Sequence, residues 1–163
     1  MARLPDRFDL WVRKARECPD ALRQVDYVLG ALAGLREWHF INIGTKEAPQ
    51  SAKSQMGADT YLLVFSDLSR VEEILHEDRN FQNFPKNAPL PVITIPTAAA
   101  MAWCVEGGAG LLVNPGEFAA MIPFERLEAF QAEWSRRGGR EAAGFWIPNL
   151  TTEEEDFWQE HGL

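Results

Sequence analysis

The sequence predicts an α+β fold in which a small mixed β-sheet of about four or more strands packs with helices. Two observations favour this class. Four short apolar segments, at 38–43, 61–65, 92–95 and 111–113, have the length and residue types of strands. They are separated by stretches whose apolar residues recur at helical spacing, without the fingerprint of a regular βαβ repeat. With 163 residues, 46% of them hydrophobic, one domain has enough material for a core.

Two helices are predicted before the first strand. Residues 8–16 have the spacing of a short helix that presents Trp11 and Ala15, and Cys18-Pro19 interrupts it. Asp20 is a suitable N-cap for the second helix, which Gly34 ends. An apolar stripe along this helix predicts a core-facing side, made of Leu22, Val25, Val28, Leu29 and Leu32. Residues 38–43 then alternate as a strand, with Trp38, Phe40 and either Ile41 or Ile43 on the inner face.

The middle of the chain is predicted to contain two long loops around a strand and a helix. Residues 44–60 have few large apolar groups, and residues 80–91 are rich in Pro and Asn, so both are expected to be loops. Residues 61–65 are a short apolar run typical of a buried strand. Ser66 or Ser69 can cap the next helix, and Ser69 with Glu72 forms a possible capping box.

The third quarter of the chain predicts strand, helix, strand and helix. Residues 92–95 form a strand that Pro96 ends. Thr97 is placed to cap an alanine-rich helix that Gly107 and Gly108 terminate. Residues 111–113 are the fourth strand. Pro123 suits the first turn of the last helix. The apolar face of that helix is expected to contain Phe124, Leu127, Phe130 and Trp134.

A sharp corner, Asn114-Pro115-Gly116, follows the fourth strand. Pro fixes φ at the second position of a type II turn, and Gly accepts the positive φ of the third. The Asn side chain can bond the backbone two residues on. Turn geometry alone therefore accounts for these three residues. A binding role remains the alternative, because a corner at a strand end exposes backbone N–H groups beside Phe118.

The chain divides at a predicted hinge, residues 136–140, into a domain of residues 1–140 and an extension of residues 141–163. The extension is acidic and contains Trp146 and Trp158, together with Phe145 and Phe157. Large aromatic side chains are costly to leave in water, so the extension is expected to dock on the domain or on a partner.

Charge and cysteine content exclude several classes of function. A net charge of −8 and a pI near 4.9 disfavour binding to nucleic acid and to anionic membranes. Two cysteines, Cys18 and Cys104, do not make a disulfide framework. The N-terminus lacks an apolar leader segment, and no apolar run has the length of a membrane span. A cytoplasmic location is expected.

The sequence predicts no catalytic, metal-binding or cofactor-binding set. Cys104 lies in an apolar helix, where a thiolate is disfavoured. His39, His76 and His161 show no ligand spacing, and no phosphate-binding glycine motif is present. If the protein were an enzyme whose groups converge only in the fold, Cys104, His39 and Glu106 would be the first candidates.

Two short motifs resemble the N-terminal domain of the SseB family, bacterial proteins named for enhanced serine sensitivity. They are Val64-Phe65-Ser66 at the end of a strand, and Gly110-Leu111-Leu112-Val113-Asn114-Pro115-Gly116 after a small-residue helix. The resemblance covers about residues 20–135. The chain departs from the family pattern in lacking Thr before Ser66, in its aromatic acidic tail, and in showing no match to the family's C-terminal domain. The resemblance implies a fold and no catalytic residues.

We therefore expect a non-catalytic module that binds another protein or forms a homo-oligomer, with no cofactor, nucleic acid or membrane as partner. The candidate binding residues are Asn114, Pro115, Gly116, Phe118, Trp146 and Trp158. The alternative function is an enzyme or a small-molecule-binding domain with its site near the corner at residues 114–116.

Overall fold

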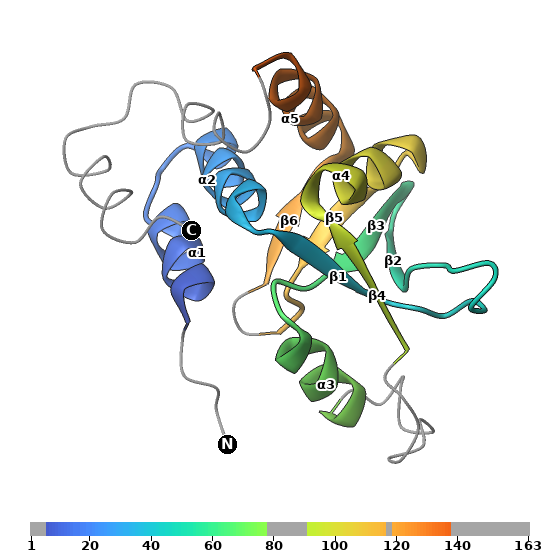
Figure 1. Ribbon diagram of the computed structural model, residues 1–163. Helices are drawn as coiled ribbons and strands as arrows, with labels where there is room; N and C mark the ends of the chain where they lie inside the picture. Colours follow the sequence, from blue (N-terminus) through green and yellow to red (C-terminus); the bar gives the residue numbers. More distant parts are fainter. Residues whose placement is uncertain (1–5, 78–90, 117–118, 138–163) are drawn as a thin grey trace.

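The computed structural model describes residues 6–77, 91–116 and 119–137 (Figure 1). These residues form helices and strands in mixed order, which confirms the predicted α+β class. The elements are α1 (Arg7–Arg16), α2 (Ala21–Gly34), β1 (Glu37–Ile41), β2 (Lys53–Met56), β3 (Asp59–Val64), α3 (Leu68–Glu77), β4 (Val92–Pro96), α4 (Thr97–Glu106), β5 (Gly110–Val113), β6 (Ala120–Ile122) and α5 (Phe124–Arg137).

The larger sheet has four strands in the order β2-β3-β5-β6. Its central pair, β3 and β5, is parallel, whereas both outer pairs are antiparallel, so the sheet is mixed as predicted. Strands β1 and β4 form a separate antiparallel pair. This pair is tied to the larger sheet beyond the end of β3, because the N–H of His39 donates to the Phe65 carbonyl (3.1 Å) and the N–H of Phe65 donates to the His39 carbonyl (2.8 Å).

Two apolar clusters hold the layers together. The larger cluster joins α1, α2, α4 and α5 to the sheet, and its largest fully buried side chains include Trp11, Tyr27, Trp38 and Phe40. The Trp38 indole N–H finds a partner inside the core and donates to the Leu32 carbonyl (3.0 Å). The smaller cluster lies beside α3, which Figure 1 shows apart from the other helices. Its buried members are Ile41, Ala52, Leu63, Phe65, Val71 and Leu75.

The predicted inner face of the first strand is confirmed in part. Trp38, Phe40 and Ile41 are all buried, whereas Ile43 is exposed beyond the end of β1. The predicted face of the last helix is also confirmed, with Leu127, Phe130 and Trp134 buried. Phe124 starts α5 and is only half-buried.

Helix capping follows the sequence at α2 but not at α3 and α4. The Asp20 carboxylate accepts from the N–H of Leu22 (2.9 Å) and caps α2 as predicted. The predicted capping box of Ser69 and Glu72 is wrong, because α3 begins at Leu68 and the Asp67 carboxylate accepts from the Arg70 N–H (3.3 Å). Helix α4 has Pro96 at its N-cap without a side-chain bond.

Thr97 has a tertiary role in place of the predicted cap. Its hydroxyl donates to the Leu35 carbonyl (2.5 Å), and its own N–H donates to the Arg36 carbonyl (3.1 Å). The start of α4 is thereby fixed to the chain that leaves α2.

The expected loop at 44–60 is the main error of the sequence analysis. It contains β2 and the first residues of β3, which pair from Lys53–Leu62 to Met56–Asp59. Strand β2 is an edge strand with mostly exposed side chains, so it carries no apolar pattern that reveals it. Strand β6 was not predicted either, since it has only three residues.

The helices of the described residues are too short and too polar to cross a membrane. An ion pair links α5 to α2. The Arg126 guanidinium in α5 forms a two-pronged contact with the Asp26 carboxylate in α2, with Nε to Oδ1 at 2.7 Å and Nη2 to Oδ2 at 2.6 Å. Asp26 is buried, so this fork compensates a charge inside the helix interface.

Candidate functional site

The parallel strands β3 and β5 end side by side, and Ser66 and Asn114 lie just beyond those ends. Carboxyl ends of parallel strands are common ligand sites, so this edge is the first place to examine. Asn114 is buried, and its backbone adopts a positive φ of 46°. Its N–H donates to the Val64 carbonyl (2.8 Å), which extends the β3–β5 pairing by one bond.

The Asn114 side chain is bonded across the two strands. Its Oδ1 accepts from the Ser66 N–H (2.9 Å), and its Nδ2 donates to the Ser66 hydroxyl (3.0 Å). The predicted bond to the backbone two residues on is therefore replaced by a contact with a different segment. Gly116 has the positive φ that the turn prediction required, at 133°. The corner is thus a structural joint, with Pro115 half-buried and Gly116 exposed.

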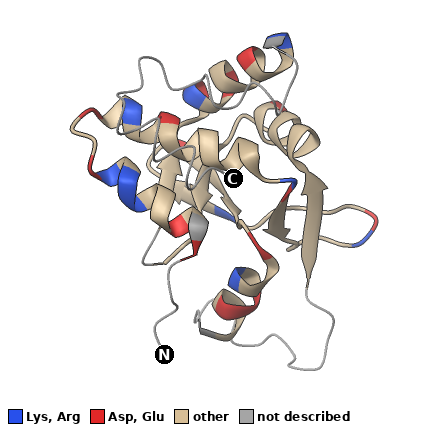
Figure 2. Cartoon of the chain, turned by 60° about the vertical axis from the view of Figure 1, so that its left-hand side comes forward, with Lys and Arg blue, Asp and Glu red and all other residues tan. Residues whose placement is uncertain are grey.

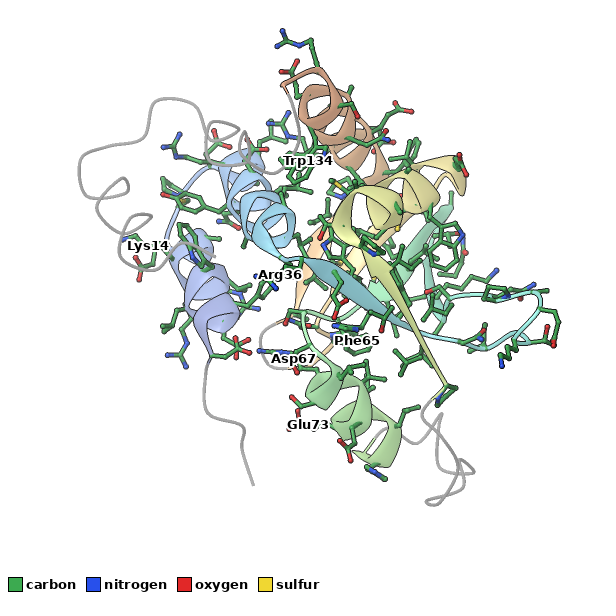
Figure 3. The ribbon with its side chains drawn as sticks, in the orientation of Figure 1. Lys14, Arg36, Phe65, Asp67, Glu73 and Trp134 are labelled. Carbon is green, nitrogen blue, oxygen red and sulfur yellow. The ribbon has the colours of Figure 1, made fainter. Side chains whose placement is uncertain are left out.

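Beside this joint lies a cluster of charged residues around the buried Arg70, which the sequence analysis missed. The Arg70 guanidinium in α3 is 7% exposed and contacts Asp6 Oδ2 at 2.6 Å and Asp9 Oδ1 at 2.7 Å. Asp67 Oδ2 lies 3.4 Å from Arg70 Nε. Burial opposes the charge of Arg70, but hydrogen bonds to Asp9 and Asp6 raise its pKa above the ordinary value. The cluster fixes the start of α1 to α3 (Figure 3 labels Asp67).

His39 is buried in β1 and is unsuited to proton transfer at neutral pH. Its Nδ1 lies 2.9 Å from the Thr94 hydroxyl, and its Nε2 lies 4.0 Å from Glu37 Oε1. Burial lowers the pKa of the imidazole, against the opposing effect of the Glu37 and Asp67 carboxylates. The neutral ring is the form that this site favours.

Cys104 is packed in the larger core. Burial raises the pKa of its thiol to about 12, so the thiolate is scarce at neutral pH. His76 is exposed near the end of α3, and Glu106 is exposed at the end of α4. Within the described ranges, no three His, Cys, Asp or Glu side chains are arranged to hold a metal ion.

Two surface pockets lie away from Asn114, His39 and Cys104. One has a volume of about 130 Å³ between the β2–β3 turn, the glycines before β5 and the start of α5. Its lining residues are Ala58, Asp59, Thr60, Tyr61, Gly108, Gly110, Pro123, Phe124 and Glu125. The other, of about 190 Å³, is a groove between α1, α2 and the segment at β6. It is lined by Val12, Ala15, Arg16, Gln24, Val25, Val28, Ala119, Ala120 and Met121, and we call it the α1–α2–β6 groove.

The α1–α2–β6 groove combines an apolar floor with polar side chains that are held in place. The Arg16 guanidinium donates to the Ala119 carbonyl (2.7 Å), and the Gln24 amide donates to the Cys18 carbonyl (2.5 Å). Met121 is 41% exposed at its edge, although it is a large apolar residue. The groove therefore presents accessible apolar surface beside a guanidinium that is held in place.

Basic residues gather beside this groove. The last turn of α1 contains Arg13, Lys14 and Arg16, of which Arg13 and Arg16 are exposed. Lys14 lies 3.4 Å from the Glu17 carboxylate. Figure 2 shows the basic positions following one another along this helix, and Figure 3 labels Lys14 there. The chain as a whole is acidic, so this basic turn is a local exception.

The structure brings together only part of the predicted site. Asn114, Pro115 and Gly116 form the corner described above, whereas Phe118, Trp146 and Trp158 lie outside the described residues. The α1–α2–β6 groove was not predicted. Its residues come from three separate segments, and the only sequence signal was the pairing of apolar and basic residues within 12–16.

Comparison of the chain with protein-family models, with curated proteins and with solved structures found no match. The resemblance to the SseB family therefore stays a prediction from the two motifs quoted above. The function is argued from the geometry of the described residues.

Proposed function

We propose that the protein is a non-catalytic, SseB-like cytoplasmic module that binds an acidic, aromatic segment of a protein chain in the α1–α2–β6 groove. The observation that carries this proposal is the groove itself, an apolar surface recess into which Arg16 is fixed by its bond to Ala119. Arg16 supplies positive charge beside apolar Val25 and Met121, and Arg13 lies in the same last turn of α1. An aromatic side chain next to carboxylates complements both properties.

The groove is the better candidate than the corner at 114–116. Asn114 is 3% exposed, and both polar groups of its side chain are hydrogen-bonded to Ser66. Neither of the two pockets described above includes a residue of that corner. Of the three groups considered for catalysis, the Cys104 thiol and the His39 ring are buried inside the fold, and the exposed Glu106 lines neither of the two pockets described above. Recognition of a partner uses the features that remain accessible.

The proposal is tested by titrating the full chain with a fluorescent peptide that contains four acidic residues followed by Phe-Trp. Binding is measured on the natural chain and on the variant Phe157→Ala/Trp158→Ala, which removes competing aromatic side chains of the extension. We expect the peptide to bind, and we expect Arg13→Glu/Arg16→Glu to weaken the affinity at least tenfold, because the new glutamates would repel the acidic residues of the peptide.

A matched charge reversal controls for net charge. Lys46→Glu/Lys53→Glu changes the charge equally but lies in an exposed loop and in β2, outside the groove. It should leave the affinity within twofold. Equal binding of a scrambled peptide, or equal losses from the two double charge reversals, would refute the proposed function.

A further inference from the structure

We infer that the α1–α2–β6 groove is occupied in cis by the chain's own C-terminal extension, with Phe157 and Trp158 in the groove and residues 153–156 against the last turn of α1. This inference rests on the proposed function, because it names the ligand of the same groove. The extension, residues 141–163, lies outside the described residues together with residues 138–140, so its sequence and the groove support the inference.

Charge complementarity selects this segment. Residues 138–163 contain one arginine and six acidic residues, so they carry five of the eight excess negative charges of the chain. Four of the acidic residues, 153–156, are consecutive and directly precede Phe157 and Trp158. The groove combines the complementary properties, because Arg16 lines it beside apolar Val25 and Met121, and Arg13 lies in the same turn of α1. An acidic run next to two aromatic residues therefore complements both the charge and the apolar surface of the groove.

The size of the groove favours a side chain rather than a helix or a small molecule. Its volume of about 190 Å³ is smaller than that of pockets for drug-sized ligands, which are roughly 300–1,000 Å³. An aromatic side chain buries a large area with few rotatable bonds, so it gains much from a recess of this size. The exposed side chain of Met121 at the edge provides a further apolar contact for such a ring.

The extension has the reach that this contact requires. Helix α5 ends at Arg137, so about twenty residues separate it from Phe157, and an extended chain of that length spans up to roughly 65 Å. Figure 1 shows α5 and α2 on the same side of the molecule, and Arg126 of α5 contacts Asp26 of α2 directly. A tethered segment acts at an effective concentration in the millimolar range, which favours binding in cis over binding to a second copy.

Docking in cis gives the extension an autoinhibitory effect. A partner segment must displace Phe157 and Trp158 before it enters the groove. The affinity for an added acidic-aromatic peptide should therefore be at least tenfold higher in Phe157→Ala/Trp158→Ala than in the natural chain.

The test uses amide spectra of the ¹⁵N-labelled full chain. Phe157→Ala/Trp158→Ala should shift the amide signals of Val25, Val28 and Met121 and leave those of Ala58–Tyr61, in the other pocket, unchanged. The matched control is Phe145→Ala/Trp146→Ala, which removes the same residue types from the same extension and should leave the groove signals in place. Retention of the remaining amide pattern shows that each variant is folded.

Three results would overturn the inference. They are groove signals that do not respond to Phe157→Ala/Trp158→Ala, an equal response to the control, and a response that depends on protein concentration, which would place the extension on a second copy. The added peptide separates this inference from the proposed function. If the peptide binds to Phe157→Ala/Trp158→Ala but the groove signals of this variant equal those of the natural chain, only docking in cis is refuted. If the groove signals shift in the variant but no peptide binds, only the proposed function is refuted.

Discussion

Asn114 and Ser66, 48 residues apart in the chain, are joined by two hydrogen bonds at the ends of β5 and β3. Both strands lie in the parallel centre of the larger sheet, so the contact between Asn114 and Ser66 fixes the points where the backbone leaves β5 and β3. The positive φ of Asn114 is tolerated because Asn enters the left-handed region more readily than most residues. The backbone geometry and the side-chain contact with Ser66 therefore account for an asparagine at position 114.

Replacement of Asn114 by alanine should lower the free energy of unfolding by about 2–4 kcal/mol. The half-buried Ser66 N–H would lose its acceptor, and alanine would be strained at φ 46°. Asn114→Gly should be less harmful by about 1 kcal/mol, since glycine accepts this φ. Urea denaturation measures both. Ser66→Ala loses only one of the two bonds, so an effect of Asn114→Ala no larger than that of Ser66→Ala would contradict this account.

The sequence predicted most of the helices well because they have an apolar stripe or a cap that is visible locally. The face at Leu127, Phe130 and Trp134 repeats at helical spacing, and all three are buried. The strands β2 and β6 escaped because they are short, and β2 is also polar. Their pairing depends on β3 and β5, to which they add as edges, and not on their own residues.

The candidate site was less predictable than the fold. The corner at 114–116 was evident from turn chemistry, but nothing near Asn114 in the sequence indicates Ser66 as its partner. The α1–α2–β6 groove was equally hidden in the sequence, because Val12, Val25 and Met121 come together only in the folded chain. Local patterns do not specify which distant segments face each other.

The two cysteines should differ in their reactivity toward a thiol reagent such as Ellman's reagent. With a pKa of about 12, the Cys104 thiol has a thiolate fraction of only about one in ten thousand at pH 8, and it is also inaccessible. Cys18 is half-buried and should react first. The variant Cys18→Ser should therefore remain unlabelled until denaturant is added, with Cys104→Ala as the matched control. Rapid labelling of native Cys18→Ser would show that the core around Cys104 opens.

Stability should fall as the pH is lowered from 7 to 5, with a contribution from His39. Burial lowers the pKa of this ring in the folded state, so between that value and 6.5 the unfolded chain binds more protons. The stabilisation is present above pH 6.5 and is lost as the pH falls towards the folded-state pKa, at a limiting slope of about 1.4 kcal/mol per pH unit.

Urea denaturation at several pH values measures this slope in the natural chain and in His39→Gln. The slope should decrease in His39→Gln, because the residue that titrates differently in the two states is absent. His76→Gln provides the control, since His76 is exposed near the end of α3. An unchanged slope in His39→Gln would assign the pH dependence to other groups.

Gly110 should be far less tolerant of substitution than Gly107, although both belong to one glycine-rich run. A Cβ at Gly110 would lie 2.5 Å from the Ile122 carbonyl oxygen and 2.9 Å from the Tyr61 ring, so Gly110→Ala must displace β6 or the ring. We expect a loss of about 1–3 kcal/mol in the free energy of unfolding. A Cβ at Gly107 would meet its nearest atom at 3.5 Å, and its φ of −75° suits alanine. Gly107→Ala should therefore be neutral or slightly stabilising. Equal urea midpoints for the two variants would show that β5 and β6 separate without cost, and that close packing does not explain the glycine that opens the Gly-Leu-Leu-Val-Asn-Pro-Gly motif.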